Sequence, residues 1–320
     1  MFQYIRVQMI HPCQAKCVWC STYRKNPQFR ALEKSGHAED FHNAYIDIIA
    51  KYRPKEVFIS GGEPLLYPKI ESFLKTIAQH TEVIHIFTSY QFNRRVMDRF
   101  SKMSLPVDKI ILNHTPIYFE PERWEKLTRG FPFEIYIDNV RKAAKLPMRK
   151  RFKFIINHSQ FHDEVARFQQ LIEPNQTCEI SLKVINDQGA GLGVETMRRT
   201  SERVQERIYD LDTILKEAGW GDRVRPKTSV DVMKDVIKSG QIEQCVYRKK
   251  PLELRLAYYK GSPDKKVLKY RYCPYFPPDF GHKLHLGRDD ISKLGKNYHK
   301  GPFRDHCGKC RMLNYKQPAK

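Results

Sequence analysis

The sequence lacks any apolar run that approaches the roughly 18 residues needed for a membrane-spanning helix. Its opening residues, Met1-Phe2-Gln3-Tyr4-Ile5-Arg6-Val7, also lack a basic segment followed by a long apolar stretch, which is the pattern of a secretory signal. These two absences argue against a spanning protein and against export. We therefore expect no membrane partner and a cytoplasmic location.

Acidic side chains are scarce relative to basic ones. The 320 residues include 57 Lys and Arg but only 36 Asp and Glu, for a formal net charge of +21. The excess is greatest near the end, because residues 245–320 contain 19 basic and 6 acidic side chains, a net of +13. A basic surface raises the local concentration of anions, so the charge favours a nucleotide, nucleic acid or phosphorylated partner. The competing interpretation is that the charge serves only solubility.

The remaining composition is that of a globular protein long enough to bury its own core, with 41% hydrophobic and 29% charged residues. Eight cysteines stand out in a chain without an export signal, where clustered cysteines indicate metal or redox chemistry more often than disulfides. They are Cys13, Cys17, Cys20, Cys178, Cys245, Cys273, Cys307 and Cys310.

Short β-rich runs alternate with stretches of helical spacing through the first part of the chain. Strands are predicted at 3–10, 56–60, 83–88, 109–113, 152–157 and 179–185, and helices at 38–52, 69–80, 93–103, 134–144 and 161–171. Such alternation predicts an α/β fold with a parallel sheet and crossover helices, and six units favour a partial (β/α)6, TIM-like barrel. Ligands of such sheets bind at the carboxyl ends of the strands.

The amino-acid composition changes near Gly219, after which Tyr, Lys, Pro and Gly become frequent and four cysteines appear. We therefore expect two domains, a barrel domain over residues 1–218 and a small, basic C-terminal domain over residues 219–320.

Three cysteines follow the first predicted strand in the pattern Cys13-x3-Cys17-x2-Cys20. Three thiolates on one short loop suit a [4Fe–4S] cluster with one iron left open for a substrate or cofactor. A structural zinc site would need a fourth protein ligand, for which His11 is the nearby candidate.

The motif Cys-x3-Cys-x-aromatic-Cys, with Trp19 at the aromatic position, resembles the signature of the radical SAM superfamily. The resemblance implies that Cys13, Cys17 and Cys20 hold the cluster, that S-adenosylmethionine chelates the open iron, and that Trp19 packs near the adenine. It also implies the family's chemistry, in which reductive cleavage of S-adenosylmethionine yields a 5′-deoxyadenosyl radical that removes a hydrogen atom from the substrate.

A second element, Ser60-Gly61-Gly62-Glu63-Pro64-Leu65, follows the second predicted strand and resembles the family's Gly-Gly-Glu-Pro element. The resemblance implies that Gly61, Gly62 and Glu63 hold the methionyl amino group. Glycines permit close approach of the backbone, and a carboxylate accepts from an ammonium group. Ser89 and Asn157 end later strands and are predicted to contact S-adenosylmethionine, with strand-end capping as their alternative role.

The remaining cysteines follow the pattern Cys245-x27-Cys273-x33-Cys307-x2-Cys310. Four thiolates can close a zinc site or hold a second [4Fe–4S] cluster. The layout resembles the twitch type of auxiliary domain, a shortened relative of the SPASM domain, and this resemblance implies the cluster. Cys178 fits neither group and is expected to be a small buried hydrophobe, with hydrogen-atom donation as the alternative.

The sequence predicts a radical SAM enzyme acting on an anionic nucleotide or nucleic acid, supplied with electrons by a donor such as flavodoxin or ferredoxin. An auxiliary cluster would favour an oxidoreductase or electron-relay mechanism. Epimerisation or crosslinking of a ribosomal peptide and dehydrogenation of a small carbohydrate stay open as alternatives. A zinc-stabilised nucleic-acid-binding protein is the alternative that is not an enzyme.

Overall fold

A computed structural model describes residues 2–9, 13–15, 17, 37–116, 119–155, 161–183, 213–220, 223–225, 253–258, 266–271, 282–291 and 294. Within these residues, strands and helices alternate in the order β1 Tyr4–Met9, α2 His37–Tyr52, β2 Glu56–Gly61, η2 Pro64–Leu66, α3 Ile70–Ile77, β3 Val83–Phe87, α4 Arg94–Ser101, β4 Ile110–His114, α5 Pro121–Thr128, α6 Phe133–Ala144, β5 Arg149–Ile155, α7 Phe161–Leu171 and β6 Cys178–Lys183. Among them, no helix is both long and apolar enough to cross a membrane.

Strands β1 to β6 lie side by side in chain order, and every neighbouring pair is parallel. A parallel pair needs a crossover connection, and a helix connects each successive pair here. This arrangement confirms the predicted α/β fold with six parallel strands, as in a partial TIM-like barrel. All six carboxyl ends therefore meet at one edge of the sheet, where the cysteine loop and the Gly-Gly-Glu-Pro element begin.

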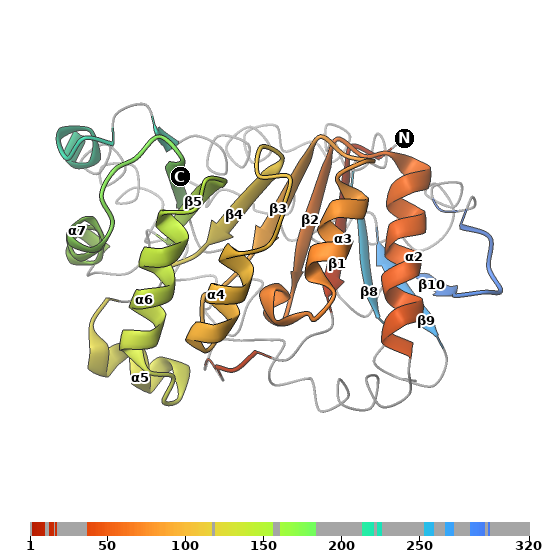
Figure 1. Cartoon of the computed structure of the whole chain (residues 1–320), viewed down its shortest axis with the longest axis horizontal. Helices are drawn as coiled ribbons and strands as arrows, with labels where there is room; N and C mark the ends of the chain where they lie inside the picture. The colour runs from red at the N-terminus through yellow and green to blue at the C-terminus, as the bar shows by residue number, and fades with distance from the viewer. Residues whose placement is uncertain are drawn as a thin grey trace, which may run out of the picture.

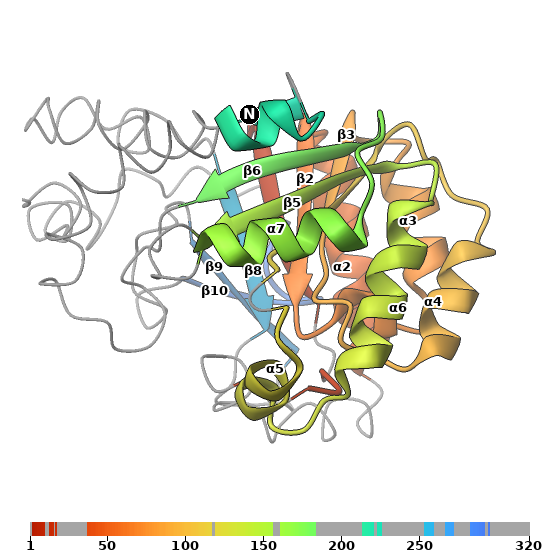
Figure 2. The ribbon, with the colours of Figure 1, turned by 90° about the vertical axis from the view of Figure 1, so that its left-hand side faces the viewer.

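Helices α2, α3, α4 and α6 cover one face of the sheet (Figures 1 and 2). Alternate side chains of β1, namely Ile5, Val7 and Met9, are buried, whereas the residues between them are only half-buried. Because successive strand residues point to opposite faces, this alternation separates a helix-covered face from an inner face. The helix-covered face holds the apolar core, and the inner face holds Arg6 and other polar side chains.

Helix α5, in the described part of the chain, was not predicted from the sequence patterns. Helix α5 is short and polar, and only Trp124 and Thr128 of its eight residues are buried. So few apolar positions give no helical period, and the helix is held instead by Pro121 at its start and by stacking of Trp124 on Tyr136, with ring centroids 3.9 Å apart.

Four more strands join the same sheet from the C-terminal part of the chain. They are β7 Val224–Arg225, which pairs with β6, and β8 Glu253–Tyr258, β9 Val267–Arg271 and β10 His282–His285 beyond β1. Strand β8 is parallel to β1, and β9 and β10 follow in antiparallel order. The division into domains at residues 218 and 219 stays a prediction.

Candidate functional site

Gly61 brings the end of β2 against the end of β1. The two strands pair in register as far as Met9 and Gly61, and Gly61 has a φ of +142°. A Cβ atom at Gly61 would lie 1.8 Å from the carbonyl oxygen of Met9, which is backbone and cannot turn aside. Only glycine therefore allows the segment leading to the cysteines to begin directly beside the Gly-Gly-Glu-Pro element.

Glu63 lies at the centre of a buried cradle and is 1% exposed. Its Oε2 accepts from the backbone N–H of Ser89 at 2.8 Å and from the Ser89 hydroxyl at 2.7 Å, and its Oε1 accepts from the N–H of Leu65 at 3.3 Å. Burial raises the pKa of Glu63, while the bonds from Ser89, Thr88 and Leu65 oppose that shift. No Lys or Arg of the described residues pairs with this carboxylate.

The cysteine loop contacts the segment that follows β3. The Sγ of Cys17 lies 3.0 Å from Oε1 of Gln91, and the side chain of Gln14 accepts from the N–H of Asn93 at 2.7 Å. The N–H of Gln91 in turn donates to the Ser89 hydroxyl at 3.3 Å. A continuous chain of hydrogen bonds therefore runs from Cys17 through Gln91 and Ser89 to Glu63.

Buried groups hold the segment after β3 in a strained shape. Tyr90 has a φ of +56°, a value that a bulky residue rarely adopts, and its side chain is fully buried. The amide of Asn139, on α6, donates to the carbonyl oxygens of Tyr90 and Phe92 at 3.1 and 2.7 Å. Strain of this kind persists only where the surroundings over-determine it, and here it directs Ser89 and Gln91 toward the site.

The described part of the site unites residues that the sequence predicted separately. Cys13 and Cys17 are half-buried thiols that form no disulfide, and Gly61, Glu63 and Ser89 lie at the same edge of the sheet. Gly62 lies between Gly61 and Glu63 and is half-buried. The predicted residues Trp19, Cys20 and Asn157 and the C-terminal cysteines Cys245, Cys273, Cys307 and Cys310 lie outside the described residues.

Gln91 is a site residue that sequence reasoning did not single out. Its 3% exposure and its contact with Cys17 depend on a fold that joins residues 74 positions apart. Its position two residues after the predicted site residue Ser89 is the signal that could have found it. His114 is structural, because its ring is buried between the carbonyl oxygen of Thr88 and the hydroxyl of Tyr136. Cys178 is fully buried.

The described residues fit the two groups that the cysteine motif implies. Glu63 is a buried carboxylate held by neutral donors, so an ammonium group such as that of S-adenosylmethionine would supply the cation that its charge needs. Cys13 and Cys17 come from one loop, and both are partly exposed thiols that are not in disulfides, as ligands of an iron–sulfur cluster must be.

Comparisons with known sequences support this assignment. The model of the radical SAM superfamily matches residues 7–172. Among curated proteins, the chain resembles GTP 3′,8-cyclase of Listeria monocytogenes, with 23% identity over 68% of this chain and 62% of that protein, and GTP 3′,8-cyclase of Lactiplantibacillus plantarum, with 25% identity over 52% of this chain and 50% of that protein. The chain thus spans about three fifths or less of the length of these relatives.

Solved structures agree on the fold. Streptococcus suis SuiB bound to S-adenosylmethionine superposes with a TM-score of 0.56 and 12% identity, covering 98% of this chain and 71% of that one. SuiB bound to the precursor peptide SuiA superposes with a TM-score of 0.57 and 13% identity, covering 92% and 65%. At this identity the likeness concerns the fold alone.

The family model covers more than half of the chain and includes Cys13, Cys17 and Glu63, so this protein belongs to the radical SAM superfamily.

Proposed function

We propose that this radical SAM enzyme cleaves S-adenosylmethionine reductively at a [4Fe–4S] cluster held by Cys13, Cys17 and Cys20, and that it acts on an anionic substrate, a nucleotide or a nucleic acid. The observation that carries the proposal is the hydrogen-bond chain from Cys17 through Gln91 and Ser89 to the buried Glu63. It links the Cys17 thiol to a buried carboxylate that pairs with no Lys or Arg of the described residues, and this supports a cofactor that bridges the two.

Each described residue has a defined role in this proposal. Glu63 accepts from the methionyl ammonium group, and the donors at Ser89 and Leu65 fix the orientation of its carboxylate. Gly61 and Gly62 let the backbone approach the ligand closely. Trp19 and Asn157 are proposed to complete the contacts with the adenosyl part. When bound, the cluster and S-adenosylmethionine supply a radical that removes a hydrogen atom from the substrate.

The buried surroundings of this unit also matter for the chemistry. Glu63 itself is 1% exposed, and Leu65, Tyr90 and Phe92, which follow Glu63 and Ser89 closely in the chain, are fully buried. Low polarity strengthens the charge-assisted bonds of Glu63 and protects a reactive radical from side reactions.

The C-terminal cysteines Cys245, Cys273, Cys307 and Cys310 are proposed to hold a second [4Fe–4S] cluster in a twitch-like domain over residues 219–320. Such a cluster would accept or relay an electron and favour an oxidoreductase, with flavodoxin or ferredoxin as the donor to the first cluster. Four thiolates would also suit zinc.

Two observations support an anionic substrate. The net charge is +21, and the curated relatives named GTP 3′,8-cyclase act, by that name, on GTP. SuiB, which was solved with a precursor peptide, shares only the fold with this chain, so peptide modification stays one alternative beside dehydrogenation of a small carbohydrate and a zinc-stabilised nucleic-acid-binding protein.

The test is to measure iron, sulfide and zinc per chain after anaerobic reconstitution, together with 5′-deoxyadenosine released after reduction. The wild type is compared with the variant in which Cys13, Cys17 and Cys20 are all alanine. About eight irons in the wild type and about four in the variant, with loss of 5′-deoxyadenosine, is the expected result for two four-iron clusters. About four irons falling to none would remove the auxiliary cluster, and 5′-deoxyadenosine released by the variant would refute the assignment of the first.

A further inference from the structure

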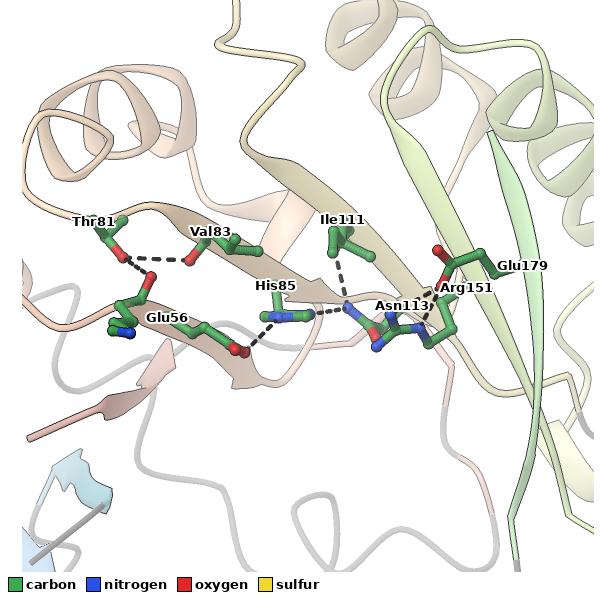
Figure 3. A network of polar contacts seen from close by, with 9 residues as sticks. Glu56, Thr81, Val83, His85, Ile111, Asn113, Arg151 and Glu179 are labelled. Carbon is green, nitrogen blue, oxygen red and sulfur yellow. Dashed lines mark hydrogen bonds and ion pairs between the residues drawn. The ribbon is translucent and has the colours of Figure 1, made fainter. Parts of the chain in front are cut away.

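A chain of polar contacts crosses the inner face of the sheet from β2 to β4. Oε2 of Glu56, on β2, lies 2.9 Å from Nε2 of His85, on β3, and Nδ1 of His85 lies 3.2 Å from Nδ2 of Asn113, on β4 (Figure 3). The ring of His85 also stacks flat on Phe58, with centroids 4.5 Å apart. His85 and Asn113 are only 5% and 1% exposed, so little water competes for the bond between them.

The surroundings of His85 fix the position of its proton. Burial lowers the pKa of His85, although Glu56 opposes that shift, so the ring is neutral at neutral pH and carries one N–H. The hydrogen bond from His85 lowers the pKa of Glu56, so this carboxyl is ionised and can only accept. The proton is therefore on Nε2, and Nδ1 is left as an acceptor.

The same reasoning fixes the orientation of the Asn113 amide. An acceptor at Nδ1 of His85 requires a donor opposite it, which is the NH2 group of Asn113. This group also donates to the carbonyl oxygen of Ile111 at 3.0 Å, in agreement with the same orientation. Oδ1 of Asn113 is buried and has no hydrogen-bond partner in the described part of the chain. Because nearly all buried polar atoms are hydrogen-bonded, this oxygen calls for a donor.

The adjacent strand does not satisfy this oxygen. Arg151, on β5, is in register with Asn113, but its Nε and Nη2 donate to Oε2 of Glu179, on β6, at 3.0 and 2.9 Å (Figure 3). The bonds of this guanidinium therefore lead toward β6. A donor for Oδ1 would then come from a molecule that binds within the barrel.

The strand register places Asn113 next to the Glu63 cradle. Asn113 is the second-last residue of β4 and is in register with Phe87, the last residue of β3. The chain continues from Phe87 to Ser89, which donates to Glu63. At about 3.3 Å per residue, two residues put Asn113 roughly 7 Å from the level of Ser89. A molecule held at the cradle, or a substrate beside it, can reach across this distance.

We infer that Oδ1 of Asn113 accepts from an N–H or O–H group of a bound molecule, and that Glu56 and His85 are positioning residues that fix its amide in this orientation. The inference rests on the proposed function, in which the bound molecule is S-adenosylmethionine or a nucleotide substrate, and both carry hydroxyl and amino groups. If the proton of His85 were on Nδ1, the amide would turn and present its NH2 group instead. The tautomer of His85 thus decides whether the site takes a donor or an acceptor.

The experiment titrates the reconstituted holoenzyme by calorimetry under anaerobic conditions, first with S-adenosylmethionine and then with GTP. Asn113→Leu removes the acceptor and nearly keeps the size of the side chain. Asn175→Leu is the matched control. Asn175 is half-buried and accepts from Thr177 just before β6, so its amide lies at the amino ends of the strands, away from the site.

We expect Asn113→Leu to weaken the binding of at least one of the two ligands about tenfold or more, and Asn175→Leu to bind both as the wild type does. Weakening confined to S-adenosylmethionine assigns the donor to the cofactor, and weakening confined to GTP assigns it to the substrate. His85→Phe, which cannot accept from Asn113, should weaken the same ligand. His85→Gln should keep most of the affinity, because its amide can donate to Glu56 and accept from Asn113.

Unchanged affinities in Asn113→Leu would overturn the inference, since water alone would then satisfy the acceptor. Equal weakening in Asn175→Leu would also overturn it, because a general loss of stability would then explain the effect. If His85→Gln binds as weakly as His85→Phe, the positioning role of His85 is refuted.

A measurement on the wild type does not depend on the folding of any variant at Asn113. The holoenzyme is labelled with ¹⁵N-histidine, and the ring nitrogens of His85 are identified by their absence from the spectrum of His85→Gln. We expect the neutral Nε2–H tautomer at neutral pH. An Nδ1–H tautomer or an imidazolium would overturn the inference, because either form turns the Asn113 oxygen toward the ring.

Failure of this inference can be told apart from failure of the proposed function. Release of 5′-deoxyadenosine by the wild type is measured separately. If the wild type cleaves S-adenosylmethionine but the Asn113 and Asn175 variants bind both ligands alike, only the inference fails. If the wild type does not cleave it, the proposed function fails, whereas the tautomer of His85 still tests the orientation of the amide.

Discussion

Replacing Gly61 by alanine should destabilise the protein far more than a similar change at another glycine of positive φ. The new Cβ would lie 1.8 Å from the Met9 carbonyl oxygen and 2.8 Å from its carbonyl carbon, well inside van der Waals contact. Both atoms belong to the backbone of a buried strand that pairs with β2 on one side and β8 on the other. The clash can be relieved only by separating β1 from β2 at their carboxyl ends.

The magnitude follows from two contributions. A residue other than glycine at a φ of +142° costs about 1–3 kcal/mol in backbone strain. Moving Met9 away also breaks pairing at the strand ends, where each lost buried hydrogen bond costs about 1–3 kcal/mol. Together these predict a loss of about 4 kcal/mol or more in the free energy of unfolding, which is exceptional for one substitution.

Gly130→Ala is the matched control. Gly130 has a φ of +86°, and a Cβ there would have no atom within 4 Å, so only backbone strain of about 1–2 kcal/mol is expected. The assay is urea unfolding of the reduced, metal-free protein, read as midpoint and slope. The reasoning is refuted if Gly61→Ala and Gly130→Ala unfold with midpoints that are the same within error.

Three further outcomes are expected. Glu63→Gln should weaken binding of S-adenosylmethionine about tenfold or more, since it removes one charge from the proposed ion pair with the ammonium group. Glu164→Gln changes a buried carboxyl that accepts from the N–H of Phe119 at another site, so it should leave this binding unchanged. Calorimetry that finds equal affinities for the two variants would contradict this role of Glu63. Gln91→Leu should make the reduction potential of a cluster bound by Cys17 more negative. Oε1 of Gln91 accepts from the Cys17 thiol at 3.0 Å, and once that sulfur is a ligating thiolate the amide has to turn its N–H toward it, where a donor stabilises the extra electron. A tenfold change in the equilibrium is about 59 mV, and a spectroscopic titration showing no shift, or a shift to higher potential, would count against this role. Burial lowers the pKa of His114 to about 4, below its ordinary 6.5, so between these pH values the unfolded chain binds a proton that the folded chain does not. The free energy of unfolding should therefore fall as the pH drops from 6.5 toward 4, by at most about 1.4 kcal/mol per pH unit. His114→Gln should flatten this pH dependence, and an unchanged slope would exclude His114 as its source.

Much of the fold could be predicted because its elements follow local periodicity. The helix-facing residues of β1 alternate along the strand, and α2 presents Phe41, Tyr45, Ile48 and Ile49 to the core, so short windows of sequence sufficed. Helix α5 escaped prediction because it is held by one stacked tryptophan rather than by an apolar stripe. Strand β8 joins the sheet by pairing with β1, and β9 and β10 extend the sheet from β8; no local pattern encodes this pairing.

The sequence by itself determined the chemistry that is carried by residues close together in the chain. The spacing of Cys13, Cys17 and Cys20 predicts a cluster site, and the Gly61-Gly62-Glu63 element predicts a carboxylate beside it, because a loop of a few residues has little freedom to place its ligands apart.

Only the tertiary structure decided which distant groups meet. Gln91 reaches Cys17 across 74 residues, Ser89 reaches Glu63 across 26, and Arg6 and Lys153 reach Phe87 from two other strands. The physical reason is that strand register, set here by close contacts such as that of Gly61 with Met9, fixes these neighbours, and register depends on all the strands packing together.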